Sequence, residues 1–351
     1  MTPELIFSCG TGGVGKTTCS VLLGVALAYQ GKKVIIVTID PARRLADSLK
    51  ISLEANDISA VPLSNCAGSL EAMMLDASVI FQSVSQENTT VEEFKELSHN
   101  RYFTFARDKM SGMQEYMAIL QVMTFVRSQK YDAIIVDTPP ARNAIEFLEA
   151  PKRLENLFSS KGLQWLSSAS GLGGISISKT FVGKGLRRFL GSEIITDMTD
   201  FFSLFQKVAR QLEKASQECT QFMQSSQTKF WIITTPEQQK PDELLAFIDY
   251  VKERDFQLAG LILNKYPNKL ASLTQKQEDI LKKNKKLSET IYWISERAQK
   301  ERERAEQQAQ QLNIEHTKKF YLPKQNLHQL DDVIKLALDL KKQLQNKPVA
   351  P

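Results

Sequence analysis

Short apolar runs alternate with amphipathic stretches along most of the chain. The apolar runs predict strands at 5–7, 34–38, 70–75, 132–136, 229–234, 258–263 and 320–322. After the first run, Val21, Leu22, Val25 and Ala26 recur at helical spacing, and Gly31 follows as a helix C-terminal signal. Buried strands separated by helices predict an α/β fold with a mostly parallel sheet flanked by helices on both faces.

Two stretches interrupt this alternation. Residues 78–110 are polar and have helical patterning, and residues 152–225 have helical patterning around a glycine- and serine-rich centre at 167–174. The second stretch carries more aromatic residues than a surface linker needs. We therefore predict that 78–110 and 152–225 form a helical subdomain inserted into a single domain that spans 1–351.

A third stretch, residues 273–315, is predicted to be a charged helical segment. Between 273 and 311 the chain is almost entirely Lys, Glu, Arg and Gln, without a sustained heptad. The pattern predicts a solvent-facing helical pair with Trp293 as an anchor. The lysines at 282, 283, 285 and 286 are interpreted as a solvated helix face in preference to a binding patch. The last helix, 330–344, is expected to dock on the sheet.

Composition narrows the class of protein. The chain has 351 residues, 42% of them hydrophobic and 24% charged, with a net charge of +5, too small to indicate a nucleic-acid partner. It has neither a signal-peptide pattern nor an apolar stretch near the ~20 residues of a membrane span, so we expect a cytoplasmic protein. Its four cysteines, Cys9, Cys19, Cys66 and Cys219, lack C-x-x-C spacing, which predicts no zinc site.

The most specific motif is a glycine-rich loop between the first strand and the first helix. Residues 10–18, Gly-Thr-Gly-Gly-Val-Gly-Lys-Thr-Thr, match G-x-x-x-x-G-K-[ST] at every fixed position. Glycines let backbone N–H groups surround a phosphate, and the helix N-terminus adds positive potential. The alternative is a glycine-rich turn with no ligand. The predicted nucleotide-binding residues of the loop are Gly12, Gly13, Val14, Gly15, Lys16, Thr17 and Thr18.

The chemistry of the motif assigns roles within the loop. Lys16 is expected to reach the β- and γ-phosphates of ATP, and the Thr17 hydroxyl to ligate Mg²⁺. Two aspartates follow other strands. Asp40 is expected to orient the attacking water, and Asp137, which ends a Walker-B pattern, to hold Mg²⁺. The alternative for either aspartate is a helix cap or turn.

Together these residues resemble the arsenite-pump (ArsA) and tail-anchored-protein-targeting ATPases, a family with a deviant Walker A loop. The matching stretches are 10–18, 38–47 and 132–151, and the last includes Asp137-Thr138-Pro139-Pro140. The resemblance implies a dimeric, nucleotide-gated Mg-ATPase whose helical subdomain binds a hydrophobic or membrane-protein client. It also implies that Asn264, within Leu263-Asn264-Lys265, contacts adenine.

Three departures from the family pattern change what is expected. Thr11 stands where the family has a signature lysine that reaches the partner's nucleotide. The cysteine pair that binds zinc between subunits in the targeting members is absent. Arg43 and Asn143 replace histidines of the targeting ATPases.

The threonine leaves three hypotheses open. The chain could be a homodimer or form a heterodimer with a lysine-containing paralogue that completes one site. Arg43, Arg44 or Arg142 could replace the lysine. Alternatively, the protein is a slow or inactive nucleotide switch, a regulatory or assembly module with a soluble partner. A weak or partner-dependent ATPase is preferred.

Overall fold

The computed structural model describes residues 2–39, 44–87, 89–108, 114–140, 144–150, 152, 201, 211, 213–237, 241–268, 280–312, 314, 317–325 and 327–345. Eight strands form a single sheet in the order β3-β4-β2-β5-β1-β6-β7-β8. The strands are β1 (Glu4–Cys9), β2 (Lys33–Thr38), β3 (Ser59–Ala60), β4 (Ser69–Met74), β5 (Ala133–Asp137), β6 (Thr228–Thr234), β7 (Leu258–Tyr266) and β8 (Lys318–Pro323).

All strand pairs are parallel except the edge pair of β3 and β4. The predicted mostly parallel sheet is thereby confirmed, and the seven predicted strands all occur. The short β3 was not predicted, because its two residues carry no apolar run. The first strand lies at the centre of the sheet between β5 and β6, so the loop that follows β1 emerges at the middle of the carboxyl edge.

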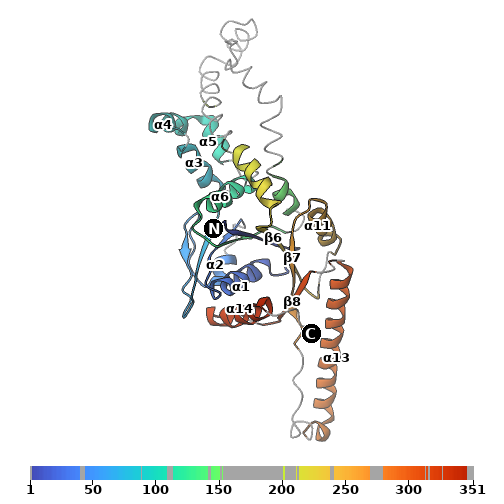
Figure 1. Ribbon diagram of the computed structural model, residues 1–351. Coiled ribbons are helices and arrows are strands. Elements are labelled where there is room, and N and C mark those ends of the chain that lie inside the picture. Colours follow the sequence, from blue (N-terminus) through green and yellow to red (C-terminus); the bar gives the residue numbers. More distant parts are fainter. Residues whose placement is uncertain are drawn as a thin grey trace.

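Helices cover both faces of the sheet (Figure 1). One face packs against α1 (Lys16–Ala28), α2 (Arg44–Leu49) and α14 (Leu330–Gln345), and Val34, Ile36 and Ile135 point into this core. The other face packs against helices that include α6 (Gln114–Ser128) and α11 (Pro241–Glu253). On this face the rings of Phe7 and Phe230 stack with their centroids 5.0 Å apart. Two-sided burial explains why the strands are apolar at consecutive positions.

The first helix ends as its sequence predicts. Gly31 adopts φ +91°, and its N–H donates to the Ala28 carbonyl at 2.9 Å. The N–H of Lys32 donates to the Leu27 carbonyl at 3.2 Å. This pair of bonds is a Schellman motif, which fixes where the chain leaves α1 and enters β2.

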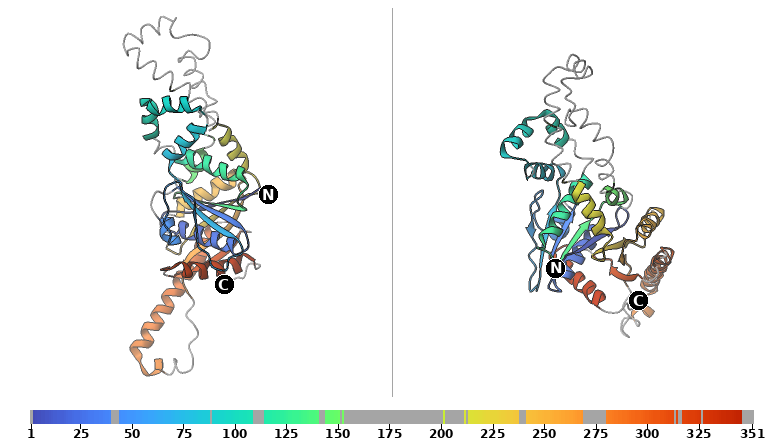
Figure 2. Two further views of the ribbon diagram at one scale, coloured as in Figure 1. Left: turned by 90° about the vertical axis from the view of Figure 1, so that its left-hand side faces the viewer. Right: turned by 45° about the horizontal axis from the view of Figure 1, so that its top comes forward.

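Three helices lie beyond α6, farther from the sheet (Figures 1 and 2). They are α3 (Ala77–Glu87), α4 (Val91–His99) and α5 (Arg101–Asp108). They occupy the stretch 78–110, which the sequence predicted to be helical. Most of the companion stretch 152–225 lies outside the described residues, so the inserted subdomain stays a prediction.

The charged segment contains a long helix, α13 (Lys285–Gln311), which joins β7 to β8 and extends away from the sheet (Figures 1 and 2). The prediction that Trp293 anchors this segment was wrong. Its side chain is 56% exposed, and its ring contact among the described residues is with Arg297 of the same helix, whose Cζ lies 5.5 Å from the ring centre. The buried residues of α13 are instead Ala305 and Ala309 near its end, because that is where the helix meets the sheet.

The predicted docking of the last helix is confirmed, since α14 buries Val333, Leu336, Ala337 and Leu340 in the same core as α1. In the described part of the chain, every helix falls short of the length or apolarity that a membrane crossing requires.

Candidate nucleotide site

The glycine-rich loop turns sharply between β1 and α1. Gly13 and Gly15 adopt φ values of +80° and +88°, a conformation that side chains disfavour. A Cβ atom added at Gly12 or Gly13 would meet nothing within 4 Å, so this side of the loop faces open space. The loop therefore presents an unobstructed backbone surface at the N-terminus of α1, as phosphate binding requires.

Lys16 begins α1 and is only 8% exposed. Its ammonium group donates to the Thr11 carbonyl at 3.0 Å, so the side chain folds back over the loop. This contact places a buried positive charge directly beside the glycines. Thr17 and Thr18 follow it in the first turn of the helix.

Asp137 is the centre of a hydroxyl cluster at the carboxyl edge. It ends β5 and accepts hydrogen bonds from Thr17 Oγ1 at 2.7 Å, Thr38 Oγ1 at 3.2 Å and Ser20 Oγ at 3.4 Å. The parallel register of β2 and β5 sets Thr38 directly opposite Asp137. The sequence-predicted metal ligands Thr17 and Asp137 thus lie together, and a hydroxyl with a carboxylate is the hard-oxygen donor set that suits Mg²⁺.

The loop and Asp137 line a cleft of about 670 Å³. Arg44, the first residue of α2, also lines this cleft, as does Glu115 of α6. The sequence pointed to Arg44 but gave no signal for Glu115, because the contact depends on how α6 packs. The cleft is large enough for a nucleotide, and its described lining residues are Gly12, Gly13, Gly15, Lys16, Thr17, Thr18, Ile39, Arg44, Asp47, Ser48, Glu115, Asp137, Thr138, Pro139 and Pro140.

Asn264, a residue of β7, holds the loop by a hydrogen bond. Its amide nitrogen donates to the Val14 carbonyl at 2.9 Å and lies 2.4 Å from where a Cβ of Gly15 would stand. The described lining of the cleft does not include Asn264. Lys265 follows at φ +54°, where the register of β7 against β8 shifts. The side-chain oxygen is the atom that would be left to accept from an adenine amino group.

Thr11 is 3% exposed, so its side chain lies within the fold. The sequence revealed the threonine but not this burial. Asp40, Arg43, Arg142 and Asn143 lie outside the described residues. The roles expected of Asp40 and of these two arginines therefore stay predictions.

The cysteines near the loop are buried. Burial raises the pKa of the Cys9 thiol to about 12, and burial also raises the pKa of Cys19. Both thiols are therefore protonated at neutral pH and poor nucleophiles. Among the described residues no three His, Cys, Asp or Glu side chains lie close enough to hold a metal ion.

A phosphate-binding loop after the central strand, with an aspartate at the end of a neighbouring parallel strand, defines the fold class of P-loop NTPases. Residues 3–297 match the ArsA ATPase family, described as anion-transporting ATPases. The chain belongs to this family of ATPases.

Curated relatives agree with this assignment. The chain is 28% identical over 176 residues to ATPase GET3 of Kluyveromyces lactis, covering 46% of this chain and 49% of that protein. It is 31% identical over 235 residues to ATPase ARSA2 of Chlamydomonas reinhardtii, covering 66% and 59%. It is 33% identical over 185 residues to ATPase GET3 of Rhodotorula glutinis, covering 52% and 50%. The chain spans about half the length of the curated relatives it matches.

Proposed function

We propose that this chain binds Mg-ATP in the cleft and hydrolyses it slowly, as a switch whose nucleotide state is read by the helical subdomain. The observation that carries the proposal is the 2.7 Å contact between Thr17 Oγ1 and Asp137, next to a glycine loop with open space before it. A metal ligand pair beside a phosphate cradle is what nucleotide hydrolysis needs.

Each residue has a role in this proposal. The backbone N–H groups of residues 12–18 and the Lys16 ammonium bind phosphate oxygens. Thr17 and Asp137 hold Mg²⁺, which neutralises charge on the β- and γ-phosphates when bound. Asp40 orients the attacking water, and the Asn264 oxygen accepts a hydrogen bond from adenine while its nitrogen stays on Val14.

We further propose that the working unit is a dimer, and that the positive charge absent at Thr11 comes either from the second subunit or from an arginine of this chain. Threonine carries no charge, and at 3% exposure it cannot extend to a neighbouring subunit. The missing cation would come from a lysine-containing paralogue or from Arg44, which lines the cleft. Relatives named as GET3 and ARSA2 ATPases support the nucleotide chemistry. A hydrophobic or membrane-protein client for the helical subdomain is part of the same proposal, as is a cytoplasmic location.

One observation favours a second function. The buried, neutral Thr11 supports a protein that binds ATP with little or no turnover and signals its nucleotide state to a soluble partner. In that case binding alone would change the conformation. The two functions share the site and differ only in whether ATP is cleaved.

The test compares binding with turnover in the purified full chain. A fluorescent ATP analogue should bind only with Mg²⁺, and Lys16→Ala should weaken binding at least about 100-fold because the charge on the phosphates loses its partner. Lys33→Ala, at an exposed lysine that begins β2, is the control and should leave binding unchanged. Absence of binding at about 1 mM ATP would overturn the proposal.

Turnover then separates the two candidates. Phosphate release that Asp137→Ala abolishes supports the ATPase. Thr11→Lys should raise that release if the signature cation is what the site lacks, and Arg44→Ala should lower it if Arg44 substitutes. Binding without release, alone or with a lysine-containing paralogue, supports the nucleotide switch.

A further inference from the structure

The long helix α13 has a fixed inner end and an exposed outer end. At the inner end Ala305 and Ala309 are buried, and Arg302 Nε donates to the Pro267 carbonyl at 2.9 Å. At the outer end Leu287 is 40% exposed and Ile294 is 43% exposed. Figures 1 and 2 show this end standing away from the sheet. The apolar side chains of the outer end are therefore exposed, on a helix whose inner end is packed against the core.

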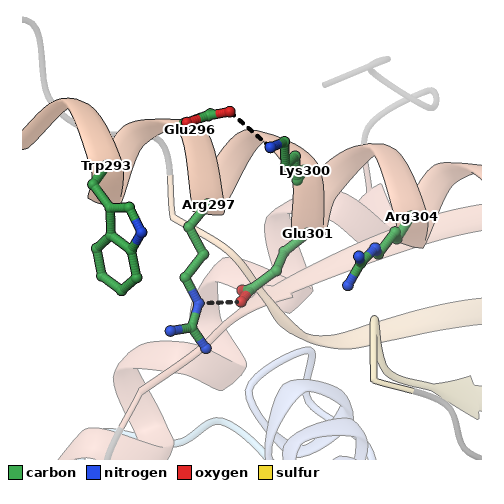
Figure 3. Close-up of a pocket in the computed structure, with 6 residues that line it drawn as sticks. All are labelled: Trp293, Glu296, Arg297, Lys300, Glu301 and Arg304. Carbon is green, nitrogen blue, oxygen red and sulfur yellow. Dashed lines mark hydrogen bonds and ion pairs between the residues drawn. The ribbon is translucent and has the colours of Figure 1, made fainter.

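Positive charge gathers at the same end. Lysines occupy positions 282, 283, 285 and 286, all exposed, and Glu289 is the single acid in the sequence from 280 to 295. Farther along, the charges pair within the helix: Lys300 Nζ meets Glu296 at 2.7 Å and Arg297 Nε meets Glu301 at 3.1 Å (Figure 3). Within α13, basic residues outnumber acidic residues only in the outer part, before Glu296.

The residues of the outer end occupy different sides of the helix. Leu287 and Ile294 are seven residues apart and share one side, and Lys286 and Trp293 precede each of them by one residue. Glu289 and Glu296 follow Leu287 and Ile294 by two residues, about 200° around the helix, so they lie opposite. Figure 3 shows Trp293 and Arg297 projecting to a common side of α13. The acids Glu289 and Glu296 therefore lie opposite the aliphatic strip, and Lys286 and Trp293 lie between the two.

We propose that the outer end of α13, together with the residues that lead into it (280–297), docks on a membrane surface that carries anionic phospholipid headgroups. The lysines supply attraction to the negative headgroups. Leu287 and Ile294 supply apolar area, and Trp293 is an amphipathic ring of the kind that gathers at the membrane–water boundary. Nucleic acid would use the lysines but would leave the exposed aliphatic strip in water. This inference does not depend on the proposed ATPase activity.

Vesicle flotation of the purified full chain tests the proposal. The chain should float with phosphatidylcholine vesicles containing about 30% phosphatidylserine, and should not float with phosphatidylcholine alone. Raising the salt concentration should release it, because the lysine attraction is screened. Failure to float with phosphatidylserine vesicles at low salt overturns the proposal.

Charge reversal identifies the surface. Lys283→Glu combined with Lys286→Glu should reduce flotation at least about tenfold. Lys318→Glu with Lys324→Glu is the matched control, since both lysines are exposed and the change in net charge is the same. Thermal unfolding of both variants checks that they fold. Equal loss of flotation in the two variants contradicts docking by α13.

Fluorescence gives a second readout. The chain has three tryptophans, so the emission shift on adding anionic vesicles is compared between the native chain and Trp293→Phe. The blue shift should occur in the native chain and be lost in the variant. A native chain whose emission does not change, or one that binds a single-stranded oligonucleotide through the same lysines but never floats, would exclude the membrane as the partner.

Discussion

The glycine loop and the outer end of α13 both rely on lysine, but in opposite settings. Lys16 is 8% exposed and held by the Thr11 carbonyl on a loop whose backbone angles only glycine adopts freely. The lysines from 282 to 286 are exposed, and they precede or begin a helix that is anchored far from them. Phosphate binding by the loop would depend on the position of each atom, whereas membrane docking by the outer end of α13 would depend on the charge of a surface.

This difference predicts how each region responds to change. A single atom added at Gly15 alters the loop, because it would lie 2.4 Å from Asn264 Nδ2. A single atom added to the outer end of α13 meets solvent. The loss of stability on substitution should therefore be small at the outer end of α13, larger at the loop and largest at the buried base of α13.

The largest effect is expected at the base of α13. Ala305→Asp places a carboxylate at a position that is 0% exposed within the core, and should lower the free energy of unfolding by about 3 kcal/mol or more. Trp293→Ala, on the same helix but 56% exposed, should change it by no more than about 0.5 kcal/mol. Urea unfolding measures both. Equal destabilisation would mean that the outer end is packed as firmly as the base.

The loop should show the next largest effect. Gly15→Ala meets both φ +88° and a 2.4 Å approach to Asn264 Nδ2, so it should cost about 2–3 kcal/mol of stability and weaken nucleotide binding. Gly12→Ala is the control, since its Cβ meets nothing within 4 Å and should cost less than about 1 kcal/mol. Thermal melts without Mg-ATP measure the loss of stability, and the further shift on adding Mg-ATP measures nucleotide binding. A Gly15→Ala protein as stable as Gly12→Ala would show that the close approach of Asn264 to Gly15 does not constrain the loop.

The smallest effect concerns ion pairs and pH. Glu4, at the start of the central strand, pairs with Lys229 at 2.7 Å and Lys32 at 2.9 Å and is 18% exposed. Burial alone would raise the pKa of Glu4, but the hydrogen bonds from Lys229 and Lys32 outweigh it and lower that pKa below 4.5. The pairs therefore stabilise the fold above about pH 4.5, and this contribution is lost as the pH falls through the lowered pKa.

Glu4→Gln should accordingly lower the free energy of unfolding by about 1 kcal/mol at pH 7 and have little effect in acid. Glu296→Gln, which removes the exposed partner of Lys300, is the comparison and should cost no more than about 0.5 kcal/mol. Chemical unfolding across the pH range distinguishes them. A Glu4→Gln difference that grows in acid would contradict the lowered pKa.

Much of the fold could be predicted because its signals are local. The apolar runs gave the seven longer strands, Gly31 gave the end of α1, and the loop motif placed Lys16 and Thr17. Asp137 could be paired with Thr17 because Asp137 ends β5 and Thr17 follows the loop after β1, at the same carboxyl edge of the sheet.

What could not be predicted depends on packing between distant segments. The contact of Asn264 with Val14 and the place of Glu115 in the cleft follow from how β7 and α6 lie against the loop. The burial of Thr11 belongs to the same class. The exposure of Trp293 was missed because helical periodicity identifies an apolar side chain but not whether another segment covers it.

The hydrogen bond between Asn264 and Val14 joins residues 250 positions apart. Because translation proceeds from the N-terminus, a ribosome has made the entire loop and Asp137 long before it makes Asn264, the residue that holds the loop at Val14. While the residues between Val14 and Asn264 are made, the nascent chain holds the loop without this support. The site therefore reaches its final geometry only after Asn264 has been translated, so a nascent chain that ends before Asn264 should not yet function as a nucleotide switch.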